Sequence, residues 1–225
     1  MIIVTGATGF IGSAIVWELN ERGYTDILAV DVVKPDARNG ILNKRKYNKF
    51  MTHTQLLDFL KENPQVEAII HMGACSSTTE MNRDYLREIN TEYTQKLFEW
   101  CTKQKVRFVY ASSGAVYGDG QQGFDDQTQP EFFTPLNPYG ESKLNFDIWA
   151  LKQKQTPPLW MGLRFFNVYG PNEYYKQDMS SVVFKAFRQI NVNGSLKLFK
   201  SHNSEYKDGE QLRDFIYVKD VTRWI

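Results

Sequence analysis

Short apolar runs alternate with stretches of helical spacing over the first three quarters of the chain. The apolar runs predict buried strands at 2–4, 27–30, 68–72, 106–111 and 160–166. Apolar residues three or four positions apart predict helices near 11–22, 56–61, 85–103 and 139–151. Because strands that alternate with helices favour a parallel sheet covered on both faces, we expect an α/β fold with a Rossmann-type doubly wound parallel sheet.

The pattern loosens after residue 170. Residues 34–50 are basic and rich in asparagine, and they predict a loop. Residues 171–208 show no clear period, whereas the run at 213–218 predicts a returning strand. We therefore expect a Rossmann domain over 1–170 and the start of a smaller, here incomplete, C-terminal substrate domain over 171–225.

A glycine-rich turn joins the first predicted strand to the first predicted helix. Gly6, Gly9 and Gly12 have the spacing G-x-x-G-x-x-G. At such a junction the first glycine permits a tight turn, the second lets the backbone approach a pyrophosphate, and the third lets helix and strand pack closely. The helix N-terminus then faces the phosphates with free N–H groups. Motif and position together predict a dinucleotide-binding site.

The end of the second predicted strand bears on which dinucleotide binds. Asp31 stands where an acidic residue hydrogen-bonds the adenosine ribose, which favours NAD over NADP. Lys34 and Arg38 follow at once, and both are suited to pair with a 2′-phosphate. These residues by themselves leave NAD and NADP open.

Three residues have the types and spacing of a site that oxidises an alcohol. Tyr139 and Lys143 are four positions apart on a predicted helix and so share a face. The Lys143 ammonium is expected to lower the pKa of Tyr139, which can then take a proton from an alcohol as hydride leaves its carbon. Ser113 follows a predicted strand, where it can hydrogen-bond the reacting oxygen. Together with the glycine-rich turn, this set predicts a nicotinamide-dependent oxidoreductase or a related enzyme.

Composition excludes several other classes. The 225 residues carry a formal net charge of +1, which gives no electrostatic case for nucleic acid or an anionic membrane surface. The chain starts without the features of a secretory leader and has no apolar run of about 18 residues, so a cytoplasmic protein is expected. Cys75 and Cys101 are too few for a disulfide framework. Neither the cysteines nor the three histidines have metal-ligand spacing, so no metal site is predicted.

Several stretches resemble one family. The turn at 6–12, Ser113-x-x-x-Tyr117-Gly118 and Tyr139-x-x-x-Lys143 resemble the extended short-chain dehydrogenase/reductase superfamily. Residues 71–80 (HMGACSSTTE), 164–171 (RFFNVYGP) with Lys176, and 213–218 (RDFIYV) are similar to the ADP-L-glycero-D-manno-heptose 6-epimerases within it. The resemblance runs along the whole chain, and that family continues beyond the position of Ile225.

The resemblance implies an epimerase. Members invert C6″ of ADP-D-glycero-β-D-manno-heptose for lipopolysaccharide core synthesis, by transient oxidation and re-reduction with tightly bound NADP, and they form homo-oligomers, often pentamers. The resemblance gives Tyr139 and Lys176 acid–base roles on opposite faces of the carbon, with Ser113 and Lys143 completing the catalytic set. Arg38 stands at the family's position for a basic residue that contacts the 2′-phosphate, which favours NADP in the 1–170 domain.

The resemblance also implies two sets of binding residues. The implied cofactor contacts are Gly6, Gly9, Phe10, Ile11, Gly12, Asp31, Val32, Arg38, Met72, Gly73, Ala74, Cys75, Ser76, Lys143, Val168 and Lys176. The implied substrate contacts are Ser113, Asn167, Asp178, Lys185, Phe199, Lys200, Ser201, His202 and Arg213. In this assignment Asn167 binds the sugar, and residues 199–202 with Arg213 hold the ADP portion.

Rival functions of two kinds remain. A sugar-nucleotide dehydratase is disfavoured because Gly114 and Ala115 stand where such enzymes carry an Asp-Glu pair. Another nucleotide-sugar 4-epimerase or reductase shares Tyr139 and Lys143, although the 71–80 stretch and Lys176 argue against it. A non-enzymatic dinucleotide sensor or scaffold protein is the alternative of a different class, and the retained tyrosine and lysine argue against it.

Overall fold

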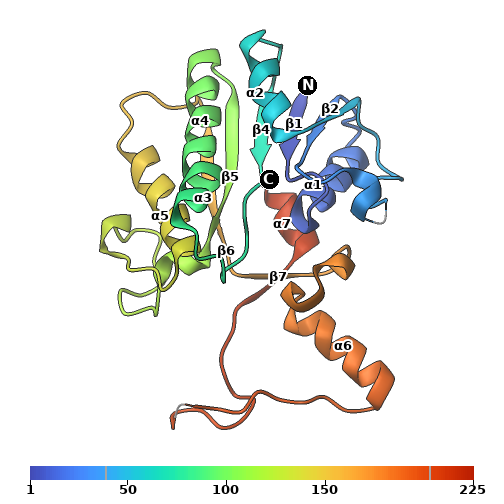
Figure 1. Ribbon diagram of the computed structural model, residues 1–225, viewed down its shortest axis with the longest axis vertical. Coiled ribbons are helices and arrows are strands. Elements are labelled where there is room, and N and C mark those ends of the chain that lie inside the picture. The colour runs from blue at the N-terminus through green and yellow to red at the C-terminus, as the bar shows by residue number, and fades with distance from the viewer. Residues whose placement is uncertain (39, 203) are drawn as a thin grey trace.

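The computed structural model describes residues 1–38, 40–202 and 204–225. Its main feature is a sheet of six parallel strands in the order β3-β2-β1-β4-β5-β6 (Figure 1). The strands are β1 Ile2–Thr5, β2 Ile27–Val30, β3 Lys49–Met51, β4 Ala68–His71, β5 Arg107–Ser113 and β6 Trp160–Phe165. The chain builds outward from β1 to β3 and then crosses to β4, so the strand order reverses between β1 and β4. Open α/β sheets bind ligands at such a reversal, beside the carboxyl ends of the strands.

Helices cover both faces of this sheet. The helices are α1 Phe10–Glu21, α2 His53–Lys61, α3 Arg83–Leu86, α4 Tyr93–Gln104, α5 Pro138–Leu151, α6 Val182–Asn193 and α7 Val218–Trp224, and a π-helical segment, Arg87–Glu92, joins α3 to α4. Ile3 of β1 points into a core formed with α2, α4 and α5. Its neighbours Ile2 and Val4 point into a second core formed with α1. The alternation of side chains along a strand thus builds the two faces of a doubly wound sheet, as the sequence predicts.

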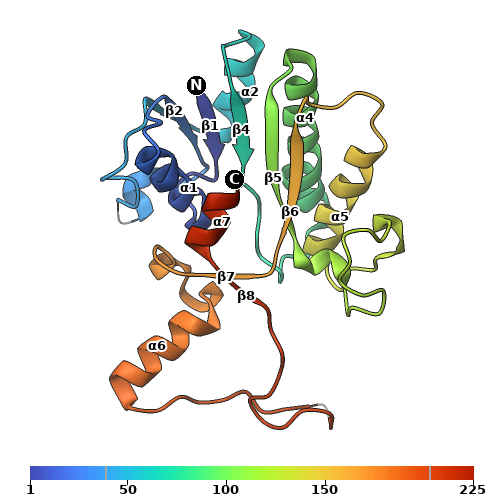
Figure 2. The same cartoon turned by 180° about the vertical axis from the view of Figure 1, so that it is seen from behind.

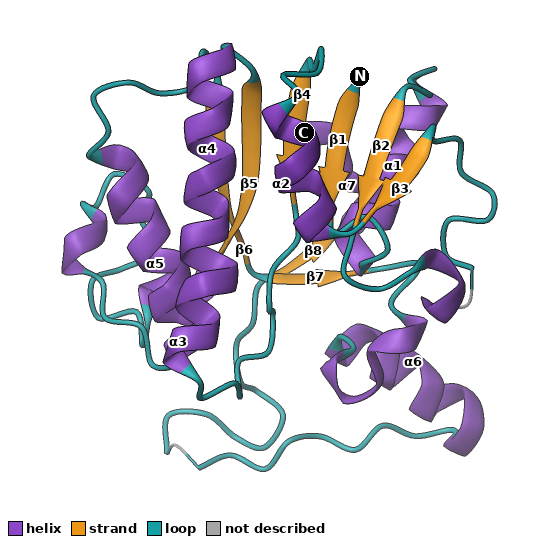
Figure 3. Cartoon of the chain, turned by 45° about the horizontal axis from the view of Figure 1, so that its top comes forward, coloured by secondary structure: helices purple, strands orange, loops and turns teal. Residues whose placement is uncertain are grey.

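Two further strands cross below the carboxyl ends of the main sheet. β7, Asn167–Tyr169, pairs in parallel with β8, Phe215–Tyr217. Figure 2 shows this pair beneath the main strands, with α6 and a long loop extending away from the sheet. In Figure 3 the arrowheads of β1, β2 and β3 point toward the same pair. Val168 of β7 and Val218 of α7 join a third apolar cluster with Phe10 of α1.

Most predicted elements are confirmed to within a few residues, and the differences have local causes. The helix predicted over 85–103 is three consecutive segments, because the π-helical turn interrupts it. The predicted loop at 34–50 contains a 3₁₀ turn, Pro35–Arg38, and the start of the short strand β3. The stretch at 171–208 contains a helix, α6, which Ser181 caps. No helix among the described residues is long and apolar enough to cross a membrane.

Candidate active site

The carboxyl ends of β1, β2 and β4 border a cavity of about 480 Å³ at the reversal of strand order. Every cofactor contact implied by the resemblance lines this cavity, except Lys143 and Val168. The lining is completed by Thr5, Val30, His53, His71, Tyr85, Ile89, Tyr93 and Tyr175. The structure therefore brings predicted cofactor contacts from four separate stretches of the chain, 6–12, 31–38, 72–76 and Lys176, to one place.

The glycine-rich turn fits a dinucleotide pyrophosphate. Gly6 has a φ of +64°, and a Cβ there would lie 2.8 Å from backbone atoms of Met72 and Gly73. A Cβ on Gly12 would overlap the carbonyl oxygen of Gly6. Gly9 is the N-cap of α1 and supplies no side-chain hydrogen bond, so the first N–H groups of the helix point toward the cavity edge without an intrahelical partner. Side chains at Gly6 and Gly12 would therefore clash with the neighbouring backbone, so the turn needs glycine at these two positions.

Asp31 and Arg38 flank the outer end of the cavity. The Asp31 carboxylate accepts hydrogen bonds from the backbone N–H groups of Thr8 at 3.0 Å, Val32 at 2.7 Å and Val33 at 3.3 Å. Asp31 thus fixes the turn after β2, in addition to any contact with a ligand. Arg38 donates to the carbonyl of Thr8 at 3.1 Å, and its guanidinium lies 4.6 Å from the centre of the Tyr175 ring.

A buried hydrogen-bonded chain holds the loop at 72–76 against β1. Thr94 donates its hydroxyl proton to the carbonyl of Asn90 at 2.7 Å, so it must accept from Nε2 of His71, which lies 3.0 Å away. Nδ1 of His71 is then the acceptor from the Thr5 hydroxyl at 2.6 Å, and Thr5 in turn accepts from the N–H of Gly73. Burial lowers the pKa of His71 to about 3, and the charge of Lys143 acts in the same direction. His71 is therefore a neutral structural residue at the edge of the cavity.

Asn90 connects the loop at 72–76 to the helix that carries Tyr139. Its side chain accepts from the N–H of Cys75 at 2.9 Å and donates to the carbonyl of Cys75 and to Ser142 Oγ, both at 3.0 Å. The neighbouring Thr91 donates to the carbonyl of Ser142. Both residues are buried in the π-helical turn, and both hydrogen-bond Ser142 of α5. Neither residue was among the predicted site residues, because their shared partner on α5, Ser142, lies more than 50 positions away in the chain.

Ser113, Tyr139 and Lys143 meet at the carboxyl end of β5. All three are buried, and Nζ of Lys143 donates to the carbonyl of Ala111 at 3.0 Å. Burial raises the pKa of Tyr139, although a hydrogen bond with Ser113 acts to lower it. Burial lowers the pKa of Lys143 to about 8. The expectation that the pKa of Tyr139 is lowered is therefore wrong here, because desolvation has the larger effect.

Lys176 lines the cavity from a 3₁₀ turn, Tyr174–Met179, whereas Ser113, Tyr139 and Lys143 are not part of its lining. Its Nζ is 5.2 Å from the centre of the Phe10 ring at the start of α1. Burial lowers the pKa of Lys176, while Glu173 acts to raise it. Lys176 is thus held near the pyrophosphate turn, in a partly desolvated position, rather than in open solvent.

The residues expected to bind substrate are not gathered in the same way. Asn167 of β7 is exposed and donates to the carbonyl of Asp214, and Val168 is buried beside Phe10. Lys185 lies on α6, and Arg213 is exposed. Residues 199–202 lie on the long loop that extends from the sheet in Figure 1, and the side chain of Asp178 lies outside the described part of the chain. None of the described residues after Lys176 lines the cavity.

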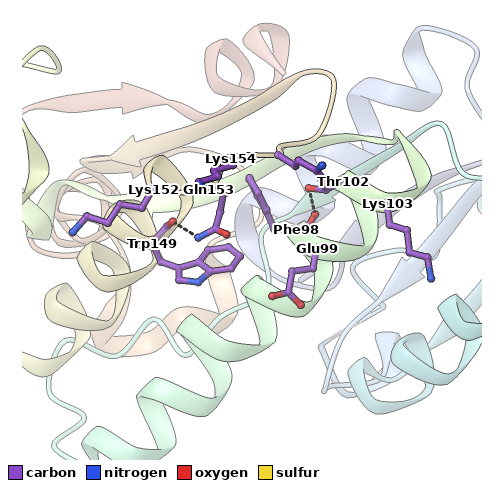
Figure 4. A pocket seen from close by; sticks show the side chains of 9 residues that line it. Phe98, Glu99, Thr102, Lys103, Trp149, Lys152, Gln153 and Lys154 are labelled. Atoms are coloured by element: carbon purple, nitrogen blue, oxygen red, sulfur yellow. Dashed lines mark hydrogen bonds between the residues drawn. The ribbon is translucent and has the colours of Figure 1, made fainter.

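A second hollow of about 520 Å³ lies at the other end of the sheet. It is bordered by the C-terminal ends of α4 and α5 and by the chain that follows α5, with Phe98 and Trp149 between lysine and glutamine side chains (Figure 4). Gln153 donates to the carbonyl of Trp149 at 2.8 Å there. This hollow is near the amino ends of the strands, where neither the glycine-rich turn nor the tyrosine reaches. Among the described residues, no group of three or more histidine, cysteine or acidic side chains is arranged to hold a metal ion.

The comparison with known proteins decides the family. The NAD dependent epimerase/dehydratase family matches residues 2–225. The chain belongs to this family. Within it, the ADP-L-glycero-D-manno-heptose-6-epimerase of Fusobacterium nucleatum is 51% identical over 227 residues, which cover 98% of this chain and 68% of the relative. The enzyme of the same name from Nitratidesulfovibrio vulgaris strain Hildenborough is 47% identical and covers 98% of this chain and 69% of the relative.

Solved structures of the family agree. The crystal structure of the Helicobacter pylori ADP-L-glycero-D-manno-heptose-6-epimerase has a TM-score of 0.81 to this chain at 28% identity, and covers 99% of this chain and 69% of that one. MoeE5 in complex with UDP-glucuronic acid and NAD has a TM-score of 0.73 at 31% identity, with 99% and 69% covered. The parallel six-stranded fold, the epimerase class and the use of a nicotinamide dinucleotide follow from this membership.

Proposed function

We propose that this protein inverts C6″ of ADP-D-glycero-β-D-manno-heptose to give the L-glycero form, with a retained nicotinamide dinucleotide. The observation that carries the proposal is the convergence of the 6–12 turn, the 71–80 stretch and Lys176 on one cavity. The relatives that share these stretches are named for this epimerase reaction. The proposal includes the homo-oligomer and the cytoplasmic setting that the family resemblance implies.

The reaction needs hydride transfer and proton transfer at the same carbon. When bound, the nicotinamide dinucleotide supplies the acceptor and donor for the hydride that leaves C6″ and returns to its opposite face. Tyr139, which hydrogen-bonds Ser113, takes the proton of the C6″ hydroxyl as its phenolate. Burial disfavours the phenolate, and the positive charges of Lys143 and of an oxidised nicotinamide bound beside it would favour it. Lys176 handles the proton on the other face. Its pKa, lowered by burial, makes it a better proton donor and acceptor near neutral pH than an exposed lysine.

We further propose NADP as the dinucleotide. Arg38 supports this choice, because a guanidinium at the cavity edge can make a bidentate contact with a 2′-phosphate. Asp31 is no obstacle, since its carboxylate already accepts three backbone N–H groups and is fixed in the turn after β2. Lys143 is not part of the cavity lining with the glycine-rich turn and Arg38, and its Nζ lies at the carbonyl of Ala111 on β5. We therefore propose that Lys143 binds the nicotinamide end of the dinucleotide.

The test is incubation with ADP-D-glycero-β-D-manno-heptose, with the configuration at C6″ followed by NMR and no dinucleotide added. Conversion to the L-glycero form supports both the reaction and the retained dinucleotide. If the protein releases a nicotinamide dinucleotide on denaturation but leaves this sugar unchanged, the substrate is another nucleotide sugar.

Two variants then separate the proposed acid–base roles. Tyr139→Phe should lower turnover by about 10²- to 10⁴-fold while the dinucleotide stays bound. Lys176→Met should block inversion yet still allow transient oxidation of the substrate. That oxidation is detected as the absorbance of the reduced form of the dinucleotide after substrate is added. Tyr24→Phe, at an exposed tyrosine that follows the C-terminal end of α1, serves as the matched control for loss of a phenol. Normal inversion by Lys176→Met would exclude the two-residue mechanism.

A further inference from the structure

Helix α5 carries a third ionisable residue on the face that holds Tyr139 and Lys143. Asp147 follows Lys143 by four positions, as Lys143 follows Tyr139, so the three side chains form one row along the helix. All three are buried. A buried carboxylate is costly unless it is paired and hydrogen-bonded, so the partners of Asp147 bear on its purpose.

Three donors hold the Asp147 carboxylate. The Tyr110 hydroxyl donates to Oδ1 at 2.8 Å, and the Ser112 hydroxyl donates to Oδ2 at 2.9 Å. Nε of Arg164, on β6, donates to Oδ2 at 3.2 Å. Burial raises the pKa of Asp147, whereas these three partners act to lower it. These three donors, one of which is the charged guanidinium of Arg164, favour the ionised form of Asp147.

The far side of Arg164 is also fixed. Its Nη1 donates to the Tyr117 hydroxyl at 3.1 Å, and the guanidinium lies 5.0 Å from the centre of that ring and 5.2 Å from the Phe133 ring. Asp126, which is mostly exposed, lies 3.7 Å from Nη1 and accepts from Tyr117. Arg164 therefore retains polar partners without Asp147, and the two members of the pair can be replaced separately.

Lys143 lacks such a direct partner in the described structure. Its Nζ donates to a neutral carbonyl, that of Ala111, and burial lowers its pKa to about 8. Asp147 is the larger of two influences that act to raise that pKa, and Cys75 is the other. His71 also faces Lys143, but as a neutral imidazole, and Tyr139 is the remaining titratable neighbour on the helix.

We propose that Asp147 is a positioning residue for the reaction. Its carboxylate is held in place by Tyr110, Ser112 and Arg164. By electrostatic attraction, without a direct hydrogen bond, it stabilises the charged form of the buried Lys143 side chain. The Arg164 pair sets how much negative charge Lys143 experiences. The inference rests on the proposed function in one respect, which is that Lys143 must be charged for turnover.

The charge state of Lys143 can be measured without any substrate. The protein is labelled with [13Cε]lysine, and the resonance of Lys143 is assigned as the one missing from Lys143→Met. Its chemical shift is then followed from pH 6 to pH 10. Asp147→Asn should move the midpoint down by about one unit or more, because an opposite charge at short range typically changes a pKa by about one to three units.

Arg164→Gln is the matched control, because it breaks the same buried pair with the opposite change of charge. Its Lys143 midpoint should rise, because the Asp147 charge is then less neutralised. A purely structural role predicts that both variants disturb Lys143 in the same direction, and that result would overturn the proposal, as would an unchanged midpoint in Asp147→Asn. If Asp147→Asn does not fold, an unchanged or lower midpoint in Arg164→Gln overturns the proposal and a rise supports it. Asp147→Glu, which keeps the charge, should titrate close to the original protein.

Turnover provides the second readout. In the pH profile of kcat with the ADP-heptose substrate, the alkaline limb should move to lower pH in Asp147→Asn and not in Arg164→Gln. If the protein does not act on that substrate, the NMR midpoints still decide the role of Asp147, so failure of the proposed function and failure of this inference give different results. NMR midpoints that shift as stated beside unchanged kcat profiles would show that Asp147 does not act on the reaction.

Discussion

The six-stranded sheet and the segment between residues 171 and 213 use their apolar side chains in different ways. In the sheet region, β1, β2 and β4 alternate between two cores, and large side chains such as Phe98 and Phe108 are almost fully buried. In the later segment, α6 has no buried residue, and Phe187, Ile190 and Val192 are exposed. The first region is placed by tertiary packing, whereas α6 is specified by its own caps, Ser181 and Gly194.

This difference matches the quality of the site. Apart from Tyr175 and Lys176, the lining of the cavity comes from the sheet region, where glycines and buried hydrogen bonds hold the turn at 6–12 and the loop at 72–76. The residues expected to bind substrate lie mostly in the later segment and do not reach the cavity. The sheet region therefore pre-organises the dinucleotide site. The expected substrate contacts lie mostly on α6 and the loop after it, and α6 is stabilised by its own caps rather than by buried contacts.

The largest effect comes from removing an equivalent ring in the two regions. Phe98, which is 1% exposed, contacts the rings of Phe108, Phe146, Trp149 and Trp160 at centroid distances of 5.3 to 6.0 Å. Phe98→Ala should lower the free energy of unfolding by about 3–5 kcal/mol, because it leaves a cavity among these rings. Phe187, which is 65% exposed, should cost less than about 0.5 kcal/mol when changed to alanine. Urea unfolding followed by circular dichroism measures both, and similar losses would mean that α6 is packed in solution.

The next effect depends on pH and tests the buried chain behind the cavity. The pKa of His71 is about 3 in the folded protein and about 6.5 in an unfolded chain. Between these values the unfolded chain binds the extra proton, so the stability that neutral His71 contributes is complete above about pH 6.5 and is lost as pH falls. The expected loss from this group is up to about 1.4 kcal/mol per pH unit in that window.

Urea unfolding at pH 7.5 and pH 5.5 measures this slope. His71→Gln should be less stable at pH 7.5, since it disturbs the hydrogen bonds with Thr5 and Thr94, yet it should lose less stability between the two pH values. An identical slope in the variant would show that other groups cause the acid sensitivity. Phe187→Ala, on α6, should not alter that slope, which separates the two regions again.

Much of the sheet region could be predicted because its signals are local. Buried runs of apolar residues locate β1, β2, β4, β5 and β6, and the glycine spacing locates the dinucleotide turn. β3 was missed because three residues that begin with an exposed lysine show no period. α6 was missed although Ser181 and apolar residues at 183, 187 and 190 have helical spacing, because the stretch at 171–208 as a whole shows no clear period.

Site residues could be predicted only where they belong to short sequence motifs, such as the glycine-rich turn and the Tyr139–Lys143 pair. Thr5, Asn90 and Asp147 support the cavity and the catalytic helix, but their partners are 66, 52 and 17 to 37 positions away. No single-sequence pattern records such pairings. The pKa of Tyr139 was mispredicted for the same reason: the spacing to Lys143 is local, whereas the burial of both groups is a property of the fold.

The last comparison concerns the contact between the two regions. Arg38, from the loop after β2, lies against the Tyr175 ring of the later segment and borders the cavity. Arg38→Ala should weaken NADP binding about tenfold to a hundredfold, because a hydrogen bond to a charged group contributes about 1.5–3 kcal/mol. Binding of NAD, which lacks the 2′-phosphate, should change by less than about threefold, within the range of an ordinary surface substitution. Fluorescence titration with the reduced forms of both dinucleotides measures the two affinities.

Lys34→Ala is the matched control, because Lys34 is the other basic residue that follows Asp31 and is exposed on the same loop. If Lys34→Ala selectively weakens NADP and Arg38→Ala does not, the 2′-phosphate lies on the other side of the loop. Equal weakening of NADP and NAD by Arg38→Ala would instead mean that the contacts with Thr8 and Tyr175 are what matters, so that Arg38 shapes the cavity edge for either dinucleotide. In that case the later segment, through Tyr175, would contribute to cofactor binding, and the division between the two regions would be less complete than their packing suggests.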